Sequence, residues 1–355
     1  MNKINKAIFF TQDDLLEHHN TSLDLVEEEL TGRYGERYTE YRKRYSEAGV
    51  FRFEPEFPLY LMLEQTYSCN LKCPSCIHGM HDFRKRFDTN TSVMPRSLFE
   101  RIILEGEKHG CPSIAFHVND EPLLVRDLPD RVAFARDHGF IDLFMTTNGV
   151  LLNPEVMKSL IEAGITRILL SLDAATPETY KKVRPGGDFS VVMNNIETLL
   201  EYRRVNNLII PAVRVSFVVT SLNVHERELF IDTFSDRVDY LEMQGFSTYY
   251  DQNSALIPTG AEQIKGFFCN APWRKLIIRA NGDVLPCCTF YGYEIVLGNV
   301  LQASIKDIFQ GEQCRHLRQE FKKGIYRLSP CLACSKACYK TKEGTLQLKH
   351  ETPAT

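Results

Sequence analysis

Short apolar runs alternate with longer amphipathic stretches over most of the chain. An apolar run of about four to eight residues is typical of a strand buried on both faces, whereas apolar positions three and four apart indicate a helix. Six such runs alternate with helical stretches, which favours a parallel sheet with right-handed crossovers, either curled into a partial barrel or open and doubly wound. The predicted strands are residues 60–66, 113–118, 141–146, 167–172, 212–219 and 239–244, with helices near 95–110, 127–138, 153–164, 188–205 and 225–236.

The two ends of the chain follow other patterns. Residues 12–48 are highly charged with scattered Leu, Val and Tyr, which predicts one or two amphipathic helices. Within 276–286 an apolar stretch is interrupted by Asn281-Gly282, a dipeptide typical of a β-hairpin turn. The predicted units are an N-terminal helical extension (1–55), an α/β unit (56–255), a smaller module that contains the hairpin (256–343) and a flexible tail (344–355).

Composition and charge narrow the choice of partners. The chain has 355 residues, of which 43% are hydrophobic, and a formal net charge of −4. Its nearest basic cluster, Arg84-Lys85-Arg86, is too short to predict a nucleic-acid-binding face. The segment from Met1 to Phe10 contains a very short apolar piece, so neither a signal peptide nor a transmembrane helix is expected. We therefore expect a cytoplasmic chain with neither a membrane nor a nucleic acid as partner.

Eleven cysteines in a chain expected in the cytoplasm indicate metal or redox chemistry rather than disulfides. Three of them, Cys69, Cys73 and Cys76, form a CxxxCxxC loop directly after the first predicted strand. A purely structural zinc or iron–sulfur site normally has four protein ligands, so three thiolates indicate a metal with one position open for a substrate or cosubstrate. The alternative is that these are three buried or zinc-binding thiols.

The cysteine loop and the strand ends that follow it resemble the radical S-adenosylmethionine (SAM) superfamily, over about residues 58–340. The resemblance implies a partial (β/α)6 barrel with a [4Fe–4S] cluster on the three cysteines, whose fourth iron chelates SAM. One electron, from a reductant such as flavodoxin or ferredoxin, then yields a 5′-deoxyadenosyl radical that takes a hydrogen atom from the substrate. The protein itself positions the cofactor and excludes water.

Segments at three later strand ends are similar to motifs of that family. Asn119-Asp120-Glu121-Pro122 corresponds to the family's Gly-Gly-Glu-Pro with both glycines replaced, Thr146-Thr147-Asn148-Gly149 contains its Thr-Asn-Gly, and Ser171-Leu172-Asp173 matches its Ser-x-Asp. Taken singly, each polar residue is also explained as a turn residue, a helix cap or one side of an ion pair. The resemblance implies SAM contacts for Glu121, Asn148, Ser171 and Asp173, with Arg184 and Arg214 as candidate partners of a carboxylate.

A second group of cysteines lies in the C-terminal module: Cys269, Cys287, Cys331 and Cys334. Four thiolates complete a closed tetrahedral or cubane site, and structural zinc is the alternative to iron. The arrangement resembles the twitch or SPASM modules of radical SAM enzymes, which implies one auxiliary [4Fe–4S] cluster. Cys288 adjoins Cys287 and is the alternative ligand, although the Gly-x4-Cys spacing from Gly282 favours Cys287.

Four cysteines then have no assigned metal. Burial is the usual role of such a thiol, and we expect it for Cys111 and Cys314, whereas Cys288 or Cys338 is a candidate donor of a hydrogen atom to a substrate radical. His117, near the end of the second predicted strand, is more often a satisfied core or loop histidine than a group that touches substrate.

The resemblance fixes the cofactor chemistry better than the substrate. We expect a small-molecule substrate, polyol or carbohydrate-like, because nothing before Tyr60 resembles a leader-peptide-binding domain. The enzyme would be an oxidoreductase, passing the electron of the substrate radical to the auxiliary cluster, or an epimerase, in which a thiol returns a hydrogen atom. The alternatives are modification of a peptide or protein side chain and, outside enzymes, an iron–sulfur or zinc-binding scaffold.

Overall fold

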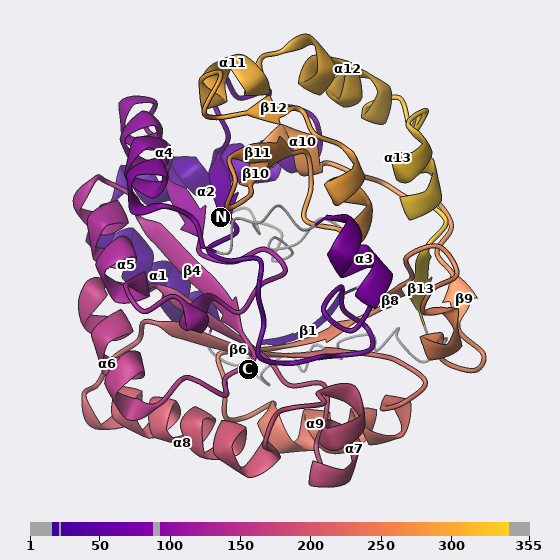
Figure 1. Cartoon of the computed structure of the whole chain (residues 1–355). Helices are drawn as coiled ribbons and strands as arrows, with labels where there is room; N and C mark the ends of the chain where they lie inside the picture. The colour runs from indigo at the N-terminus through magenta and orange to yellow at the C-terminus, as the bar shows by residue number, and fades with distance from the viewer. Residues whose placement is uncertain (1–15, 21–22, 88–92, 341–355) are drawn as a thin grey trace, which may run out of the picture.

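A curved ten-stranded sheet organises the molecule (Figure 1). The computed structural model describes residues 16–20, 23–87 and 93–340. The strands lie in the order β1-β7-β6-β5-β4-β3-β2-β10-β11-β12. Their bounds are β1 (Leu16–Asn20), β2 (Tyr60–Leu63), β3 (Ser113–Ala115), β4 (Asp142–Thr147), β5 (Arg167–Ser171), β6 (Ala212–Val218), β7 (Tyr240–Gln244), β10 (Lys275–Ile278), β11 (Asp283–Leu285) and β12 (Gly298–Asn299).

Strands β2 to β7 are the six predicted strands, and each is parallel to its neighbour. The helices between them follow one another around the outside of the sheet (Figure 1), so the expected partial (β/α)6 barrel is confirmed. The connecting helices are α4 (Arg96–Lys108), α5 (Leu128–Asp137), α6 (Pro154–Ala163), α7 (Pro177–Val183), α8 (Phe189–Val205) and α9 (Arg227–Phe234), and the short helix α3 (His81–Arg86) follows the cysteine loop.

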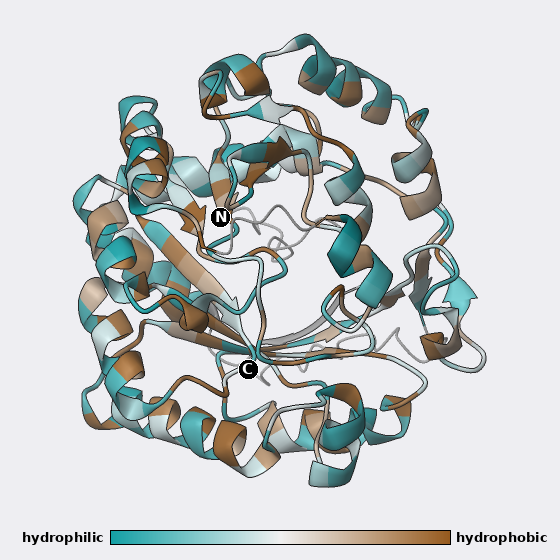
Figure 2. Cartoon of the chain, in the orientation of Figure 1, coloured by the Kyte–Doolittle hydropathy of each residue, from teal (hydrophilic) through white to brown (hydrophobic). Residues whose placement is uncertain are grey.

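Alternate residues of each barrel strand point to opposite faces of the sheet and pack into two different clusters. On β2, Leu61 and Leu63 belong to the apolar core beneath the outer helices, whereas Tyr60 and Met62 belong to a second, aromatic-rich cluster on the inner face. Figure 2 shows the outer helices with hydrophobic residues interspersed among hydrophilic ones, as helices with one buried side require. The inner face therefore carries different side chains from the packed outer face.

Two helices from the N-terminal segment pack against the inner face of the sheet. The charged segment 12–48 predicts these helices, but it does not predict the strand that precedes them. The helices are α1 (Leu23–Tyr34) and α2 (Glu36–Gly49), and Tyr38, Tyr41 and Tyr45 of α2 join the inner cluster. The expectation of helix over the whole segment is wrong for β1, which pairs antiparallel with β7. An open sheet edge presents unpaired backbone groups that another strand can satisfy, and that pairing decides the conformation of this polar segment.

The C-terminal module is built onto the barrel sheet. Strand β10 pairs parallel with β2, and β11 returns antiparallel through the predicted Asn281-Gly282 turn. A separate three-stranded sheet, β8-β13-β9, joins a segment before residue 255 to one near the end of the described chain. Its strands are β8 (Phe246–Ser247), β9 (Glu262–Gln263) and β13 (Cys338–Lys340), and the module's helices are α10 (Ala271–Arg274), the 3-10 helix η5 (Phe290–Glu294), α11 (Ile305–Phe309), α12 (Glu312–Phe321) and α13 (Ser329–Cys334).

Within the described ranges, no helix has both the length and the apolar composition that crossing a bilayer requires. The predicted tail, 344–355, lies outside the described residues.

Candidate active site

The cysteine loop follows β2 and is folded tightly on itself. The backbone N–H of Cys76 donates to the carbonyl of Cys73 at 3.0 Å, and the N–H of Gly79 donates to the carbonyl of Cys76 at 2.9 Å. A Cβ atom at Gly79 would lie 2.2 Å from the carbonyl oxygen of Cys73, so the chain can pass this closely because the residue is glycine. The loop thereby holds three thiols within eight residues.

Hydrogen-bond donors from three segments of the chain lie near two of these thiols. The N–H of Leu71 lies 3.4 Å from Sγ of Cys69, Nδ2 of Asn148 lies 3.8 Å from the same sulfur, and Nη1 of Arg184 lies 3.7 Å from Sγ of Cys73. Burial raises the pKa of Cys69 to about 11. Donors of this kind favour sulfur in its anionic, metal-binding form and oppose the effect of burial.

Glu121 is the anchor of the adjoining strand ends. Its buried carboxylate accepts from the hydroxyl of Thr147 at 2.6 Å, from the N–H of Asn148 at 2.8 Å and from the N–H of Leu123 at 3.1 Å. Burial raises the pKa of Glu121, and these donors oppose the rise. Glu121 thus fixes Asn148 beside the cysteine loop, which is the place that the sequence motif predicts for both.

The two residues that replace the family's glycines have roles that the sequence did not reveal. Oδ2 of Asp120 accepts from the backbone N–H groups of Gln65 and Thr66, at 3.0 and 3.2 Å, and so ties the start of the cysteine loop to the end of β3. Nδ2 of Asn119 donates to the carbonyl of Cys288 at 3.1 Å. Asn119 and Asp120 therefore connect the loop beside Glu121 to both cysteine-bearing regions.

Of the two candidate arginines, one lies beside the cysteine loop. Arg184 forms an ion pair with Asp173, whose other oxygen accepts from the N–H of Val218 at 2.8 Å. Asp173 follows Ser171, the last residue of β5. Arg214 instead forms an ion pair with Glu242 of β7 at 2.5 Å, in the barrel interior.

The interior of the barrel is lined by further buried polar groups. His117, whose Nδ1 accepts from the N–H of Thr146 at 3.0 Å, is buried, and its pKa is lowered to about 3 by burial and by the charges of Arg214 and Lys275. His117 follows β3, Arg214 belongs to β6 and Lys275 begins β10, and the charges of both cations act on the buried imidazole. Lys275 is fully buried, and its Nζ lies 3.4 Å from Sγ of Cys288.

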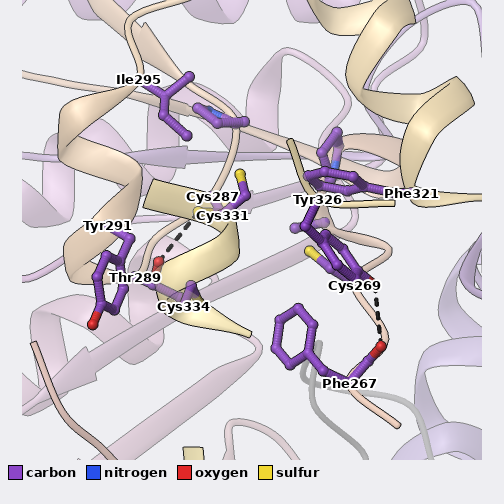
Figure 3. A pocket seen from close by; sticks show the side chains of 13 residues that line it. Phe267, Cys269, Cys287, Thr289, Tyr291, Ile295, Phe321, Tyr326, Cys331 and Cys334 are labelled. Atoms are coloured by element: carbon purple, nitrogen blue, oxygen red, sulfur yellow. Dashed lines mark hydrogen bonds between the residues drawn. The ribbon is translucent and has the colours of Figure 1, made fainter. Parts of the chain in front are cut away.

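The second group of cysteines surrounds a cavity (Figure 3). Burial raises the pKa of Cys269 to about 12, and Cys287 adds to the rise, as expected for thiols that face each other. The hydroxyl of Thr289 lies 3.3 Å from Sγ of Cys287. The four cysteines share this cavity with apolar and aromatic side chains, among them Phe267, Tyr291, Ile295, Phe321 and Tyr326.

The adjacent residues Cys287 and Cys288 face different parts of the molecule. Cys287 lines the four-cysteine cavity, whereas Cys288 packs against the aromatic-rich cluster of the barrel's inner face. Cys338 is buried beside Ile264, with its Sγ 3.7 Å from the carbonyl of Cys334. Cys111 and Cys314 are buried in the outer core, as expected. All eleven cysteines lie in the described part of the chain, and no disulfide joins any of them.

Comparison with known families agrees with both cysteine regions. Residues 63–232 match the radical SAM superfamily, and residues 269–335 match SPASM, an iron–sulfur cluster-binding domain. The chain belongs to the radical SAM superfamily. As a radical SAM enzyme with a SPASM module, it uses a SAM-binding [4Fe–4S] cluster, an auxiliary iron–sulfur cluster and SAM.

Two relatives by sequence are named for different functions. It is 25% identical over 276 residues to a probable GTP 3',8-cyclase of Methanocaldococcus jannaschii, covering 78% of this chain and 80% of that protein. It is 27% identical to the tungsten-containing aldehyde ferredoxin oxidoreductase cofactor-modifying protein of Pyrococcus furiosus, covering 78% of this chain and 87% of that protein.

Solved structures share the fold at 18% identity. BtrN in complex with AdoMet and 2-DOIA matches with a TM-score of 0.50 over 77% of this chain and 89% of that chain. SuiB of Streptococcus suis bound to S-adenosylmethionine matches with a TM-score of 0.54 over 88% and 81%, and anSMEcpe with bound AdoMet with 0.55 over 79% and 86%.

The donor sets fit the two clusters. The open set offers three thiols, two of which have hydrogen-bond donors near the sulfur, and the closed set offers four thiols around an apolar cavity. A Cβ atom at Gly292 would lie 2.3 Å from the carbonyl of Cys287, so this loop, like the one at Gly79, is shaped by the absence of a side chain. These features agree with one site that is open to a cosubstrate and one that is closed by protein.

Proposed function

We propose that this radical SAM enzyme removes a hydrogen atom from a small hydroxyl-rich molecule, a polyol or a carbohydrate, and oxidises or epimerises the reacting carbon. The observation that carries the proposal is the polar interior of the barrel. His117, Arg214, Glu242 and Lys275 are all buried there, and Cys288 contacts Lys275 at the same interior. Hydroxyl groups of a substrate can add hydrogen bonds to such donors and acceptors, whereas an apolar substrate would desolvate them without compensation.

The relatives by sequence support a small molecule. The two proteins that this chain matches over 78% of its length are named for the cyclisation of GTP and for the modification of a cofactor. SuiB, which shares the fold, has been solved bound to a precursor peptide. Peptide modification is therefore the outcome that would replace our proposal.

The geometry supports an assignment of the site residues. We assign the SAM-binding cluster to Cys69, Cys73 and Cys76, and the auxiliary cluster to Cys269, Cys287, Cys331 and Cys334, because Cys287 rather than Cys288 lines the shared cavity. When bound, the first cluster and SAM supply a 5′-deoxyadenosyl radical that can take a hydrogen atom from the substrate.

The surrounding polar residues would hold SAM in place. Glu121, Asn148, Ser171 and Asp173 stand at neighbouring strand ends, and Arg184 reaches both Asp173 and Cys73. Arg214 is better placed to meet the substrate, because its ion pair with Glu242 lies in the barrel interior.

The reaction also needs an electron donor and a reducing compartment. We propose a one-electron reductant such as flavodoxin or ferredoxin, and the cytoplasm as the location, in keeping with eleven cysteines that form no disulfide.

Transfer of deuterium from substrate to 5′-deoxyadenosine tests the proposal. The anaerobically reconstituted enzyme would be reduced with dithionite and incubated with SAM and a panel of carbon-deuterated polyols, aminocyclitols and hexoses. We expect deuterated 5′-deoxyadenosine with at least one of them, and no SAM cleavage by Cys73→Ala under the same conditions. Transfer from deuterated peptides alone would replace the small-molecule assignment with peptide modification.

Turnover in heavy water then separates the two reaction types. Between the two candidate thiols, the position of Cys288 at the barrel interior favours it over Cys338, which is buried beside Cys334. Epimerisation predicts solvent deuterium at the reacting carbon in the product, and loss of that label with Cys288→Ala but not with Cys338→Ala. An oxidised product without solvent deuterium would assign dehydrogenation instead.

A further inference from the structure

The basic cluster Arg84-Lys85-Arg86 lies outside both cysteine sites. It forms the second half of α3, the short helix that follows the cysteine loop. Phe83 of this helix is buried, whereas Arg84 is half-buried and Lys85 and Arg86 are exposed. Figure 1 shows α3 apart from the ring of outer helices that covers the barrel. The cluster thus places positive charge at the surface of a chain whose formal net charge is −4.

A fourth cation, Lys72, belongs to the same surface. It is an exposed residue of the cysteine loop, next to Cys73. Its carbonyl oxygen would lie 3.2 Å from a Cβ atom at Gly79, an exposed residue two positions before α3. The loop therefore folds back on itself and brings Lys72 beside the start of the helix. Positive charge from two segments meets at this point.

A groove opens at this surface, between the cysteine loop and the segment 248–256 that leads into the SPASM module. It is lined by Pro74 and Gly79 of the loop, by His81 and Asp82 of α3, and by Ala255 and Leu256. Tyr250 of the same segment is 42% exposed, and its hydroxyl donates to Glu294, which also pairs with Arg86. Exposed aromatic and arginine side chains are enriched where proteins bind one another. The groove and its neighbours Lys72, Arg84, Lys85, Arg86 and Tyr250 are here named the α3 face.

The α3 face carries more positive than negative charge. Glu294 pairs with Arg86 at 3.2 Å, and a carboxylate oxygen of Asp82 lies 3.4 Å from Nδ1 of His81. Within the described part of the chain, the other three cations of the face have no acidic side chain at ion-pair distance. Such a face attracts a partner that carries negative charge and steers its approach.

We propose that the α3 face docks an acidic one-electron carrier protein, which reduces the cluster bound by Cys69, Cys73 and Cys76. One electron passes from the reduced carrier to the cluster, and the carrier leaves oxidised by one electron. Lys72 and Gly79 are exposed parts of the loop that holds these cysteines, so a protein seated on this face touches the loop itself. The face has this role only if the enzyme takes its electron from a reductant protein, as proposed above.

SAM cleavage driven by two reductants tests the docking surface. The reconstituted full-length enzyme would receive electrons either from flavodoxin, kept reduced by NADPH and flavodoxin reductase, or from dithionite, a small ion that needs no docking surface. In Arg84→Glu/Lys85→Glu we expect kcat/KM for flavodoxin to fall at least about tenfold, because the variant repels an acidic partner. Dithionite-driven formation of 5′-deoxyadenosine should be unchanged.

A matched variant and added salt complete the test. Lys43→Glu/Lys158→Glu makes the same change of net charge at exposed positions of α2 and α6, and should leave kcat/KM for flavodoxin unchanged. Raising the ionic strength from about 0.05 M to about 0.3 M should slow flavodoxin-driven cleavage more in the wild type than in the α3 variant, because salt screens the attraction.

Each other result counts against the α3 face in its own way. An unchanged kcat/KM for flavodoxin in the α3 variant, an equal fall in the matched variant, or no cleavage by wild type with flavodoxin would overturn the proposal. An equal loss with both reductants would also overturn it, by assigning the two cations to the folding of the cysteine loop. A wild-type enzyme that fails to cleave SAM even with dithionite would contradict the proposed function itself.

Discussion

Gly292 lies so close to the backbone of Cys287 that a side chain does not fit. A Cβ atom there would be 2.3 Å from the carbonyl oxygen of Cys287 and 2.8 Å from its sulfur. Contacts this short with backbone atoms cannot be relieved by a change of rotamer, so the loop itself would have to move. Because Cys287 supplies one of the four thiols, such a movement would change the geometry of the whole set.

Gly292→Ala should therefore disturb the auxiliary site alone. We expect the iron content of the reconstituted protein to fall from about eight to about four per chain, because one cubane cluster is lost and the other is kept. Iron analysis together with the visible absorption of the clusters would measure the change. Gly32→Ala is the control, since nothing lies within 4 Å of a Cβ atom at that position of α1. Full iron loading in Gly292→Ala would show that the loop can adapt.

Residue types and spacing predicted the two sets of thiols but not their surroundings. Cys69, Cys73 and Cys76 are close in sequence, so a loop alone brings them together. The choice between Cys287 and Cys288 depends on which side of the chain faces the cavity, and spacing favoured the one that lines it. The contacts of Lys275 and Asp120 could not be inferred from sequence, because only the fold brings them close to Cys288 and Gln65, respectively.

At the scale of elements, the short helix α3 connects the cysteine loop to the SPASM module. Phe83 of α3 packs against Tyr249 and Tyr293, with ring centres 4.7 and 5.6 Å apart. The carboxylate of Glu294 accepts from the hydroxyls of Tyr249 and Tyr250, at 3.1 Å each, and pairs with Arg86 at 3.2 Å. Side chains from three segments thus converge on Glu294.

Replacing Glu294 with Ala should loosen α3. Two hydroxyl hydrogen bonds and a partly exposed ion pair contribute together about 1–3 kcal/mol, and 1.4 kcal/mol corresponds to a tenfold change in an opening equilibrium. We expect amide hydrogen exchange across residues 81–87 to accelerate at least about tenfold, as measured by mass spectrometry. Glu28→Ala, at an exposed position of α1, should leave that segment unchanged. Unaltered exchange in Glu294→Ala would mean that the aromatic contacts alone hold α3.

The order of elements was easier to predict than their pairing. Each barrel strand is a nearly continuous apolar run between helical stretches, so its existence could be inferred from local sequence. The polar segment of β1 had no such pattern, and its pairing with the edge of β7 is a tertiary effect. The hairpin of β10 and β11 was predicted from Asn281-Gly282, but nothing in its sequence showed that β10 would extend the barrel sheet beside β2.

At the scale of the whole molecule, that pairing joins the barrel and the SPASM module into one sheet. Leu61 and Leu63 of β2 share the outer core with Leu276 and Ile278 of β10, and all four are at least 95% buried. Separating the two parts would expose this apolar surface and leave the backbone groups of β2 unpaired. We therefore expect the barrel and the SPASM module to unfold together.

The chain offers a direct test, because its single tryptophan lies in the module. Trp273 is buried beside Phe51, with ring centres 5.0 Å apart, and reports on the module, whereas far-ultraviolet circular dichroism is dominated by the helices around the barrel. We expect the two signals to change at the same urea concentration when the metal-free protein is unfolded, since coincident transitions indicate one cooperative unit. A fluorescence change at clearly lower urea would contradict this expectation and identify the module as a separate unit. Leu276→Asn places a polar group in the shared core and should destabilise it. If the barrel and the module unfold as one cooperative unit, both transitions should move to lower urea by the same amount.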